Sequence, residues 1–147
     1  MGPAPPLLLA GFDASLRYAD DNATPTSAAV GAVVTDGART YAERSLAVDA
    51  FVSSTSLEFR ALLEAVRAVD AEFDDVAALH VRGDADAVVR AVDPEHHAEA
   101  PGPVARRRVE AVRALVADIP VVTYRSIPRA QNRRAHDLAQ AGHRERG

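Results

Sequence analysis

Three acidic residues stand where predicted secondary-structure elements begin or end. Asp13 closes the apolar run 7–12, and Asp84 closes a second apolar run over 78–83. Glu58 lies near the start of a helical pattern. Carboxylates at the ends of buried elements are costly to desolvate unless positive charge lies between them. A divalent cation would supply that charge and would turn the three acids into one site for phosphodiester chemistry.

The hydrophobic pattern predicts the elements that would position these acids. Strands are expected over about 7–16, 28–35, 39–48, 76–81 and 121–126. Helices are expected from 53–56 onward, from about 85 to the residue before Pro94, over about 104–117 and over about 130–141. Segments 18–27 and 94–103 carry turn residues and are expected to be loops. Three strands followed by alternating helices and strands predict an α/β protein with one mixed five-stranded sheet and helices on its faces.

Two local signals support this order. The pair Asp36-Gly37 between two strand-like runs indicates a hairpin, so the first three strands are expected to form an antiparallel meander. Residues 53–56 offer hydroxyl groups for a helix N-cap. Glu58 lies one turn before Leu62, which is part of the apolar repeat, so Glu58 is expected on or beside the buried stripe of that helix.

The composition limits the classes of protein. A length of 147 residues with 48% hydrophobic residues predicts a single domain over 1–147, with loose ends at 1–6 and 143–147. The net charge of -4 and the pI near 5.7 argue against a protein that coats nucleic acid through bulk charge, but not against a local basic surface. The chain has no lysine, and the arginine fork suits phosphate better than a point charge does.

The chain contains no cysteine, which excludes disulfides, thiol catalysis and cysteine zinc sites and fits a reducing compartment. The apolar run 7–10 is far too short to span a membrane, and no basic residue precedes it as in a signal peptide. We therefore expect a cytoplasmic protein that does not contact membranes. No feature of the sequence implies a protein partner.

Four segments, in this order, resemble the ribonuclease H family (type 1). Residues 13–15, Asp-Ala-Ser, resemble its first-strand Asp-Gly-Ser. Residues 55–62 resemble the Asn-x-Glu-Leu-x-Ala-Leu of its first helix, and residues 83–89 resemble the Ser-Asp-Ser before its second helix. Residues 128–139 resemble its closing Arg-x-x-Asn-x-x-Ala-Asp-x-Leu-Ala, which is the most specific of the four. The resemblance covers most of residues 7–142.

The resemblance implies a ribonuclease H-like fold and an endonuclease that cuts the RNA strand of an RNA/DNA hybrid by two-metal catalysis. Two Mg²⁺ or Mn²⁺ ions are expected, with Asp13 bridging both. Glu58 and Asp84 would hold one ion, and a fourth residue would complete the second site. Divalent ions about 4 Å apart offset the charge of the phosphodiester and activate water near neutral pH.

The fourth position departs from the family pattern. The closing aspartate of the motif falls on His136, while Asp137 follows one residue later, and a shift of one residue rotates a helical side chain by about 100°. Imidazole is a poorer ligand for magnesium than for manganese or zinc. Because some branches of the family carry histidine here, we expect His136 to occupy the position and keep Asp137 as the alternative catalytic and metal-binding residue.

Substrate contacts are expected around these acids. The hydroxyl groups of Ser15, Thr55 and Ser56 are candidates, since a hydroxyl can contact a ribose 2′-OH. Arg129 lies in a short loop without the mobile catalytic histidine of longer family members, as in a compact branch of the family. Arg129 is expected to bind phosphate or to assist the leaving group, and Asn132 of the closing motif completes the set.

Other interpretations stay open. The histidine at position 136 and the alanine at position 14 also suit a weak or inactive domain that binds hybrid or double-stranded RNA. A different nuclease of the same superfamily, such as a junction resolvase, is a second alternative. A lobe of a sugar-kinase-like ATPase is disfavoured, because the chain has no glycine-rich phosphate loop. The three arginines at 106–108 either lie on a solvated face or bind the DNA strand of a hybrid.

Overall fold

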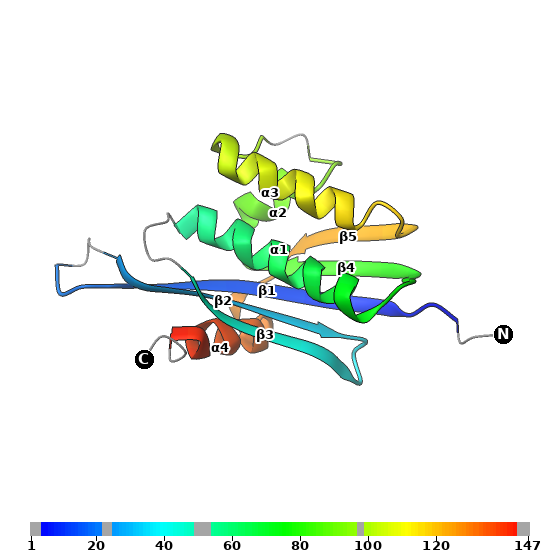
Figure 1. The fold of residues 1–147 in the computed structure, drawn as a ribbon, viewed down its shortest axis with the longest axis horizontal. Helices are drawn as coiled ribbons and strands as arrows, with labels where there is room; N and C mark the ends of the chain where they lie inside the picture. The colour runs from blue at the N-terminus through cyan, green and yellow to red at the C-terminus, as the bar shows by residue number, and fades with distance from the viewer. Residues whose placement is uncertain (1–3, 22–24, 49–53, 97–98, 144–147) are drawn as a thin grey trace.

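The computed structural model describes residues 4–21, 25–48, 54–96 and 99–143 (Figure 1). Its elements, in chain order, are β1 (Leu7–Tyr18), β2 (Pro25–Thr35), β3 (Thr40–Val48), α1 (Ser54–Glu72), β4 (Ala78–Gly83), α2 (Asp86–Val92), α3 (Gly102–Leu115), β5 (Val121–Ser126), a 3₁₀ turn (Arg129–Gln131) and α4 (Arg133–Gly142). Within these ranges, no helix is both long enough and apolar enough to cross a membrane.

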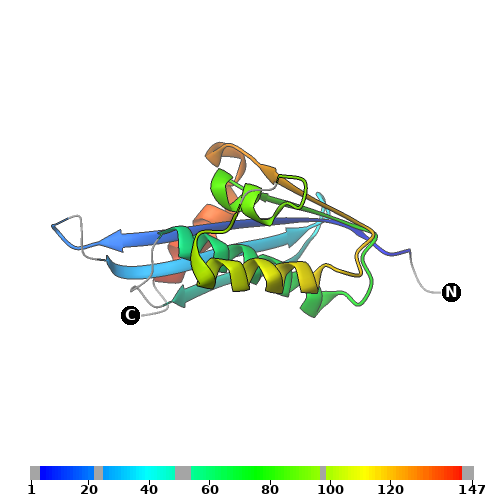
Figure 2. The ribbon, with the colours of Figure 1, turned by 90° about the horizontal axis from the view of Figure 1, so that it is seen from above.

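One mixed five-stranded sheet forms the centre of the molecule, with strand order β3-β2-β1-β4-β5. The first three strands pair antiparallel, whereas β1 with β4 and β4 with β5 pair parallel. Helices α1 and α3 lie on one face of this sheet and α4 on the other (Figures 1 and 2). This architecture confirms the predicted α/β class, the meander and the alternating second half.

The main core lies between the sheet and α1. Every second residue of the first half of β1 points into it, and Leu8 and Phe12 are fully buried there. From α1, Leu62 and Val66 enter the same core at the predicted helical spacing. Burying side chains of this size contributes about 1.5–3 kcal/mol each. These contacts hold α1 against β1, and with it the residue Glu58.

Helix α4 lies unusually close to the other face of the sheet because small residues meet there. A Cβ atom added at Gly31 of β2 would overlap the backbone of Ala135 and Ala139, so only glycine allows this approach. At the other end of α4, a Cβ atom at Gly142 would lie 2.7 Å from the Cβ of Ala29. The position of α4 over β1 and β2 therefore depends on the absence of side chains at two places.

The structure corrects three sequence-based expectations. Strand β2 begins at Pro25, inside the predicted loop 18–27, and a proline at the first residue of a strand removes no ladder hydrogen bond from its centre. The last helix is not continuous from residue 130, because Asn132 (φ -110°, ψ 25°) separates the 3₁₀ turn from α4. The predicted loose end does not begin at residue 143, since His143 is 7% exposed and hydrogen-bonded. Residues 1–3 and 144–147 of the predicted loose ends lie outside the described residues.

Candidate active site

The carboxylates meet where β4 separates from β1. The parallel pairing of these strands ends at Phe12 opposite Gly83, and Asp13 and Asp84 follow these two residues directly in the chain. Because the two strands run parallel and in register, the residues just beyond their paired stretch lie side by side, although they are 71 positions apart in sequence. A Cβ atom at Gly83 would overlap the Phe12 ring, so this glycine lets the two strand ends close on each other.

Glu58 completes the cluster from the first turns of α1. Carboxylate oxygens of Asp13, Glu58 and Asp84 all lie within 4.8 Å of one another. Asp13 is 1% exposed, and the other two acids are half-buried. The three acids singled out from the sequence are therefore adjacent in the fold, as a shared cation site requires.

Burial and mutual repulsion disfavour the charged forms of these acids. Burial, followed by the charges of Asp13 and Asp84, raises the pKa of Glu58 to about 8. Burial and the Asp84 charge also raise the pKa of Asp13, against the opposing effect of its hydrogen bond with His136. Among the buried side-chain oxygens and nitrogens that the structure describes, Glu58 Oε2 is the one without a hydrogen-bond partner. The cluster is thus an arrangement that added positive charge would stabilise.

His136 of α4, and not Asp137, reaches the cluster. Its Nδ1 lies 2.9 Å from Oδ2 of Asp13, and its side chain is 30% exposed. Asp137 is exposed, on the rim of a hollow that Arg129 and Arg133 also line. The structure therefore brings together four of the five residues predicted to bind metal and leaves Asp137 outside the contact.

The predicted substrate-contact residues lie in two kinds of environment. Thr55 is exposed near the start of α1. Arg129 is also exposed, and its Nε lies 3.3 Å from Oδ2 of Asp84. Asn132 and Ser15, in contrast, are buried, at 5% and 9% exposure. Asn132 Nδ2 donates a 2.9 Å hydrogen bond to the carbonyl oxygen of Phe12, so this residue joins the start of α4 to β1 next to Asp13.

Further side-chain hydrogen bonds join α4 and the residue after it to β1 and β2. Ser15 accepts a hydrogen bond from Gln140 Nε2 (3.0 Å) and forms another with His143 Nε2 (2.9 Å). His143 Nδ1 lies 2.6 Å from the Ser27 hydroxyl oxygen. These contacts secure the helix that carries His136.

Ser56 and Arg108 connect α1 to α3. The Arg108 guanidinium donates a hydrogen bond to the Ser56 carbonyl oxygen, although α3 starts 48 residues after α1. The Arg108 side chain therefore supports the start of α1, whereas residues 106 and 107 are exposed. Among the residues that the structure describes, Arg108 is the member of the three-arginine run that has a hydrogen-bond partner.

Gly31 and the polar partners on α4 were missed in the sequence. Gly31 interrupts an apolar strand, and an isolated glycine in a strand often marks close approach of another backbone. That signal was present in the segment 28–34, Ala-Ala-Val-Gly-Ala-Val-Val. Nothing in the sequence marked His143 or Gln140, because their partners lie more than 110 residues away.

A family model described as "Reverse transcriptase-like" matches residues 12–142. The chain belongs to this family. The matched range contains Asp13, Glu58, Asp84 and His136. No curated protein sequence matches the chain.

Solved structures of ribonucleases H share this family's fold. RNase H1 from the halophilic archaeon Halobacterium salinarum NRC-1 is 26% identical over 94% of this chain and 98% of its own, with a TM-score of 0.77. LC11-RNase H1, solved in complex with an RNA/DNA hybrid, is 20% identical over 94% of this chain and 97% of its own, with a TM-score of 0.78. The N-terminal RNase H domain of a Mycobacterium tuberculosis protein is 22% identical over 92% and 98%, with a TM-score of 0.73. The chain is a member of the ribonuclease H family, as the sequence motifs predict.

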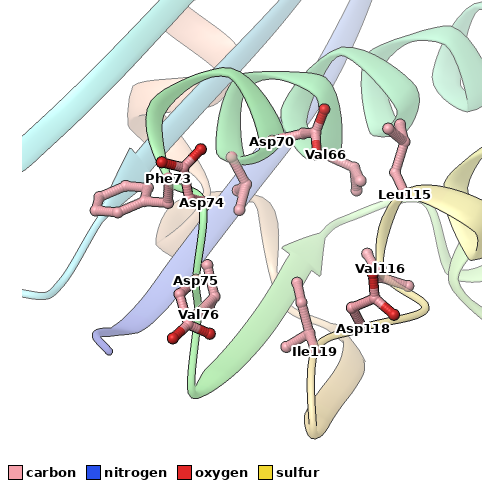
Figure 3. A pocket seen from close by; sticks show the side chains of 11 residues that line it. Val66, Asp70, Phe73, Asp74, Asp75, Val76, Leu115, Val116, Asp118 and Ile119 are labelled. Carbon is pink, nitrogen blue, oxygen red and sulfur yellow. The ribbon is translucent and has the colours of Figure 1, made fainter. Parts of the chain in front are cut away.

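A second group of acids lies at the other end of β4. We call the exposed side chains of Asp70, Asp74, Asp75 and Asp118 the acidic rim, because they surround a small cavity of about 110 Å³. Figure 3 shows their carboxylates spread around the cavity, whose wall includes Phe73 and Ile119.

Proposed function

We propose that this protein is a metal-dependent endonuclease that hydrolyses the RNA strand of RNA/DNA hybrids. The observation that carries the proposal is the cluster of Asp13, Glu58 and Asp84 within 4.8 Å, in a chain of the ribonuclease H family. Membership of the family supports nuclease chemistry, and the cluster supplies the ligands for it.

The residues present fit divalent cations. All three acids offer hard oxygen ligands, which magnesium and manganese prefer. The Glu58 Oε2 atom is buried without a partner, and the pKa of Glu58 is raised to about 8 by burial and neighbouring charge. Bound Mg²⁺ or Mn²⁺ would supply charge neutralisation at the phosphodiester and a water nucleophile at neutral pH.

Asp13, Glu58 and Asp84 would hold the cations, with Asp13 the shared ligand because it lies deepest. His136 fixes the orientation of the Asp13 carboxylate through Nδ1 and is the proposed fourth ligand, in preference to Asp137. Arg129 balances the charge of Asp84. Its exposed guanidinium is free to move to a substrate phosphate, which we propose as its role in binding.

Hybrid is the proposed substrate because LC11-RNase H1, which shares the fold, was solved with an RNA/DNA hybrid. The hydroxyl of Thr55 is exposed near Glu58 and is suited to a 2′-OH contact, which distinguishes RNA from DNA. Ser56 is a weaker candidate for the same contact, and the buried Ser15 a weaker one still.

The test is Asp13→Asn, assayed on a labelled RNA/DNA hybrid with Mg²⁺ and then with Mn²⁺. We expect the unsubstituted protein to cut the RNA strand and the variant to lose activity by about a thousandfold, equivalent to about 4 kcal/mol. The folded structure should persist, because the asparagine is isosteric and removes repulsion with Asp84. Full activity in Asp13→Asn would refute the mechanism.

A second candidate function follows from the hydrogen bond between His136 and Asp13. With an imidazole in the fourth position, the domain would bind hybrid but cut it weakly or not at all. Hybrid binding without cleavage in either metal would favour this function. Cleavage of four-way DNA junctions in preference to hybrid would instead indicate a resolvase.

A further inference from the structure

One part of the sheet has no helix over it among the described residues. Helix α4 packs against β1, β2 and β3, while α1, α2 and α3 lie on the opposite face (Figure 2). The α4 side of β4 and β5 is therefore open, together with the first half of β1. The parallel register aligns the outward residues of these three strands in rows: Leu7, Ala78 and Val121; Leu9, His80 and Thr123; Gly11, Arg82 and Arg125.

The third row places two arginines side by side. Arg82 and Arg125 are register partners on adjacent strands, and neither has a hydrogen-bond or ion-pair partner within the described ranges. The contact between His80 Nδ1 and Thr123 Oγ1, at 2.6 Å, shows that side chains of paired residues meet on this face. Like charges on neighbouring strands destabilise a sheet, and an anion between them would offset that cost.

An apolar hollow of about 240 Å³ adjoins the arginines. Its apolar lining includes Leu9, Val33 and Ile127, and Arg82 and Arg133 lie at its sides. Gly11 keeps it open, because a Cβ atom there would point toward Val33 Cγ1 at 3.3 Å. The volume is below the range of about 300–1,000 Å³ that is usual for drug-sized ligands and suits a fragment such as one base.

The hollow lies next to the candidate active site along β1 and β4. Gly11 precedes Asp13 by two residues and Arg82 precedes Asp84 by two, which corresponds to about 7 Å along each strand. Arg133 lines both this hollow and the one bordered by His136 and Asp137. A strand leaving the carboxylate cluster would therefore pass Arg133 before it reaches the open face.

We propose that this open face binds an unpaired nucleotide of a strand that extends beyond the hybrid. The base would enter the apolar hollow, and the adjoining phosphates would lie against Arg82 and Arg125. A nucleotide combines a flat base, whose faces can contact apolar side chains, with an anionic phosphate, and this surface offers an apolar hollow beside arginines. The inference rests on the proposed function and adds a preference for hybrids with a single-stranded extension.

The test compares a blunt RNA/DNA hybrid with the same hybrid carrying a five-nucleotide single-stranded extension. Binding is measured by fluorescence anisotropy in the Asp13→Asn background, where cleavage is expected to be about a thousandfold slower. We expect the extension to tighten binding about tenfold, which corresponds to about 1.4 kcal/mol. Arg82→Gln/Arg125→Gln should remove this gain and lower the salt dependence of log K for the extended hybrid by about 1.4, at about 0.7 per lost phosphate contact.

The control Arg90→Gln/Arg113→Gln removes the same charge from α2 and α3 on the opposite face and should keep the gain. Circular dichroism verifies that both double variants are folded. Equal binding of blunt and extended hybrids by the parent protein would refute the proposal, as would a gain that persists in Arg82→Gln/Arg125→Gln. A separate assay of blunt-hybrid cleavage, with Asp13 restored, tests the proposed function by itself. A protein that binds the extension but cuts nothing would overturn the nuclease and leave the nucleotide site standing.

Discussion

Acidic residues lie at both ends of β4, but those at the carboxyl end are close together and those at the amino end are not. At the carboxyl end, Asp13, Glu58 and Asp84 have oxygens within 4.8 Å and are wholly or half-buried. At the amino end, the four aspartates of the acidic rim are exposed and stand apart around their cavity (Figure 3). In the described ranges, the three-acid group at the carboxyl end is the one close enough to hold a metal ion.

The difference comes from what holds each group of acids. The rim acids stand on a helix end and on loops, where water solvates each carboxylate separately. The carboxylate cluster is enclosed by α1 and α4 and by the glycines that let backbones approach. Enclosure raises the pKa of Asp13 and Glu58, because burial and like charge both disfavour ionisation. Acidity in the sequence is therefore a poor guide to a cation site unless the fold also removes water from it.

The largest expected difference between the two ends of β4 is in cation binding. At a hundredfold excess over Kd, Mg²⁺ or Mn²⁺ should stabilise the protein by about 2.7 kcal/mol, which thermal unfolding detects as a higher Tm. Asp84→Asn should remove most of the shift, whereas Asp74→Asn in the acidic rim should keep it. An equal loss in both variants would mean that the rim also binds the cation.

Gly31→Ala tests whether close packing builds the site. The new methyl group would push α4 away from β2, at a cost of about 1–3 kcal/mol. It should also lower kcat by detaching His136 from Asp13. Gly142→Ala crowds the far end of α4 and should destabilise the protein without the same loss of kcat. In a double-mutant cycle with His136→Ala, Gly31→Ala should then have little further effect on kcat, and full additivity would contradict this link.

The stability of the metal-free protein should fall as pH rises from about 4.5 to 8. The folded pKa of Glu58, about 8, lies above its value of 4.5 in the unfolded chain, so the unfolded chain loses this proton first. With chelator present, the free energy of urea unfolding should be lower at pH 8 than at pH 5. Between these two pH values the full pKa difference corresponds to about 3.5 kcal/mol, and contact of the half-buried Glu58 with water should reduce the contribution of this group to roughly 1–2 kcal/mol. Glu58→Gln should reduce the change of unfolding free energy with pH, and Asp75→Asn should not. A flat profile in the parent protein would show that Glu58 is not desolvated.

The smallest expected effect concerns the choice between positions 136 and 137. His136→Asp supplies the carboxylate that magnesium prefers and should raise the ratio of Mg²⁺- to Mn²⁺-supported cleavage about tenfold, or about 1.4 kcal/mol. Asp137→Asn should leave that ratio unchanged, because Asp137 lies outside the contact. The opposite pattern would assign the fourth position to Asp137.

The sequence predicted most of the helices and strands and the residues that form the site, but not the detailed geometry of the site. Period-two and helical patterns located β1 and α1, and the order of motifs brought Asp13, Glu58 and Asp84 into one hypothesis. The break at Asn132 was missed because it depends on a hydrogen bond to Phe12, which is 120 residues away. The preference for His136 over Asp137 came from the family resemblance, and helical geometry alone would not have produced it.

The site can form only after the end of the described chain has been synthesised. It depends on the hydrogen bond from Asn132 to Phe12 and on the contact between His136 and Asp13. Both span more than 115 residues, so β1 emerges from a ribosome long before its partners on α4. At about 5–20 residues per second, this interval is of the order of 6–24 seconds. During synthesis the three acids lack the helix that orients Asp13, so under the proposed function we expect a nascent chain not to cut nucleic acid near the ribosome. Activity would begin only when the last helix docks.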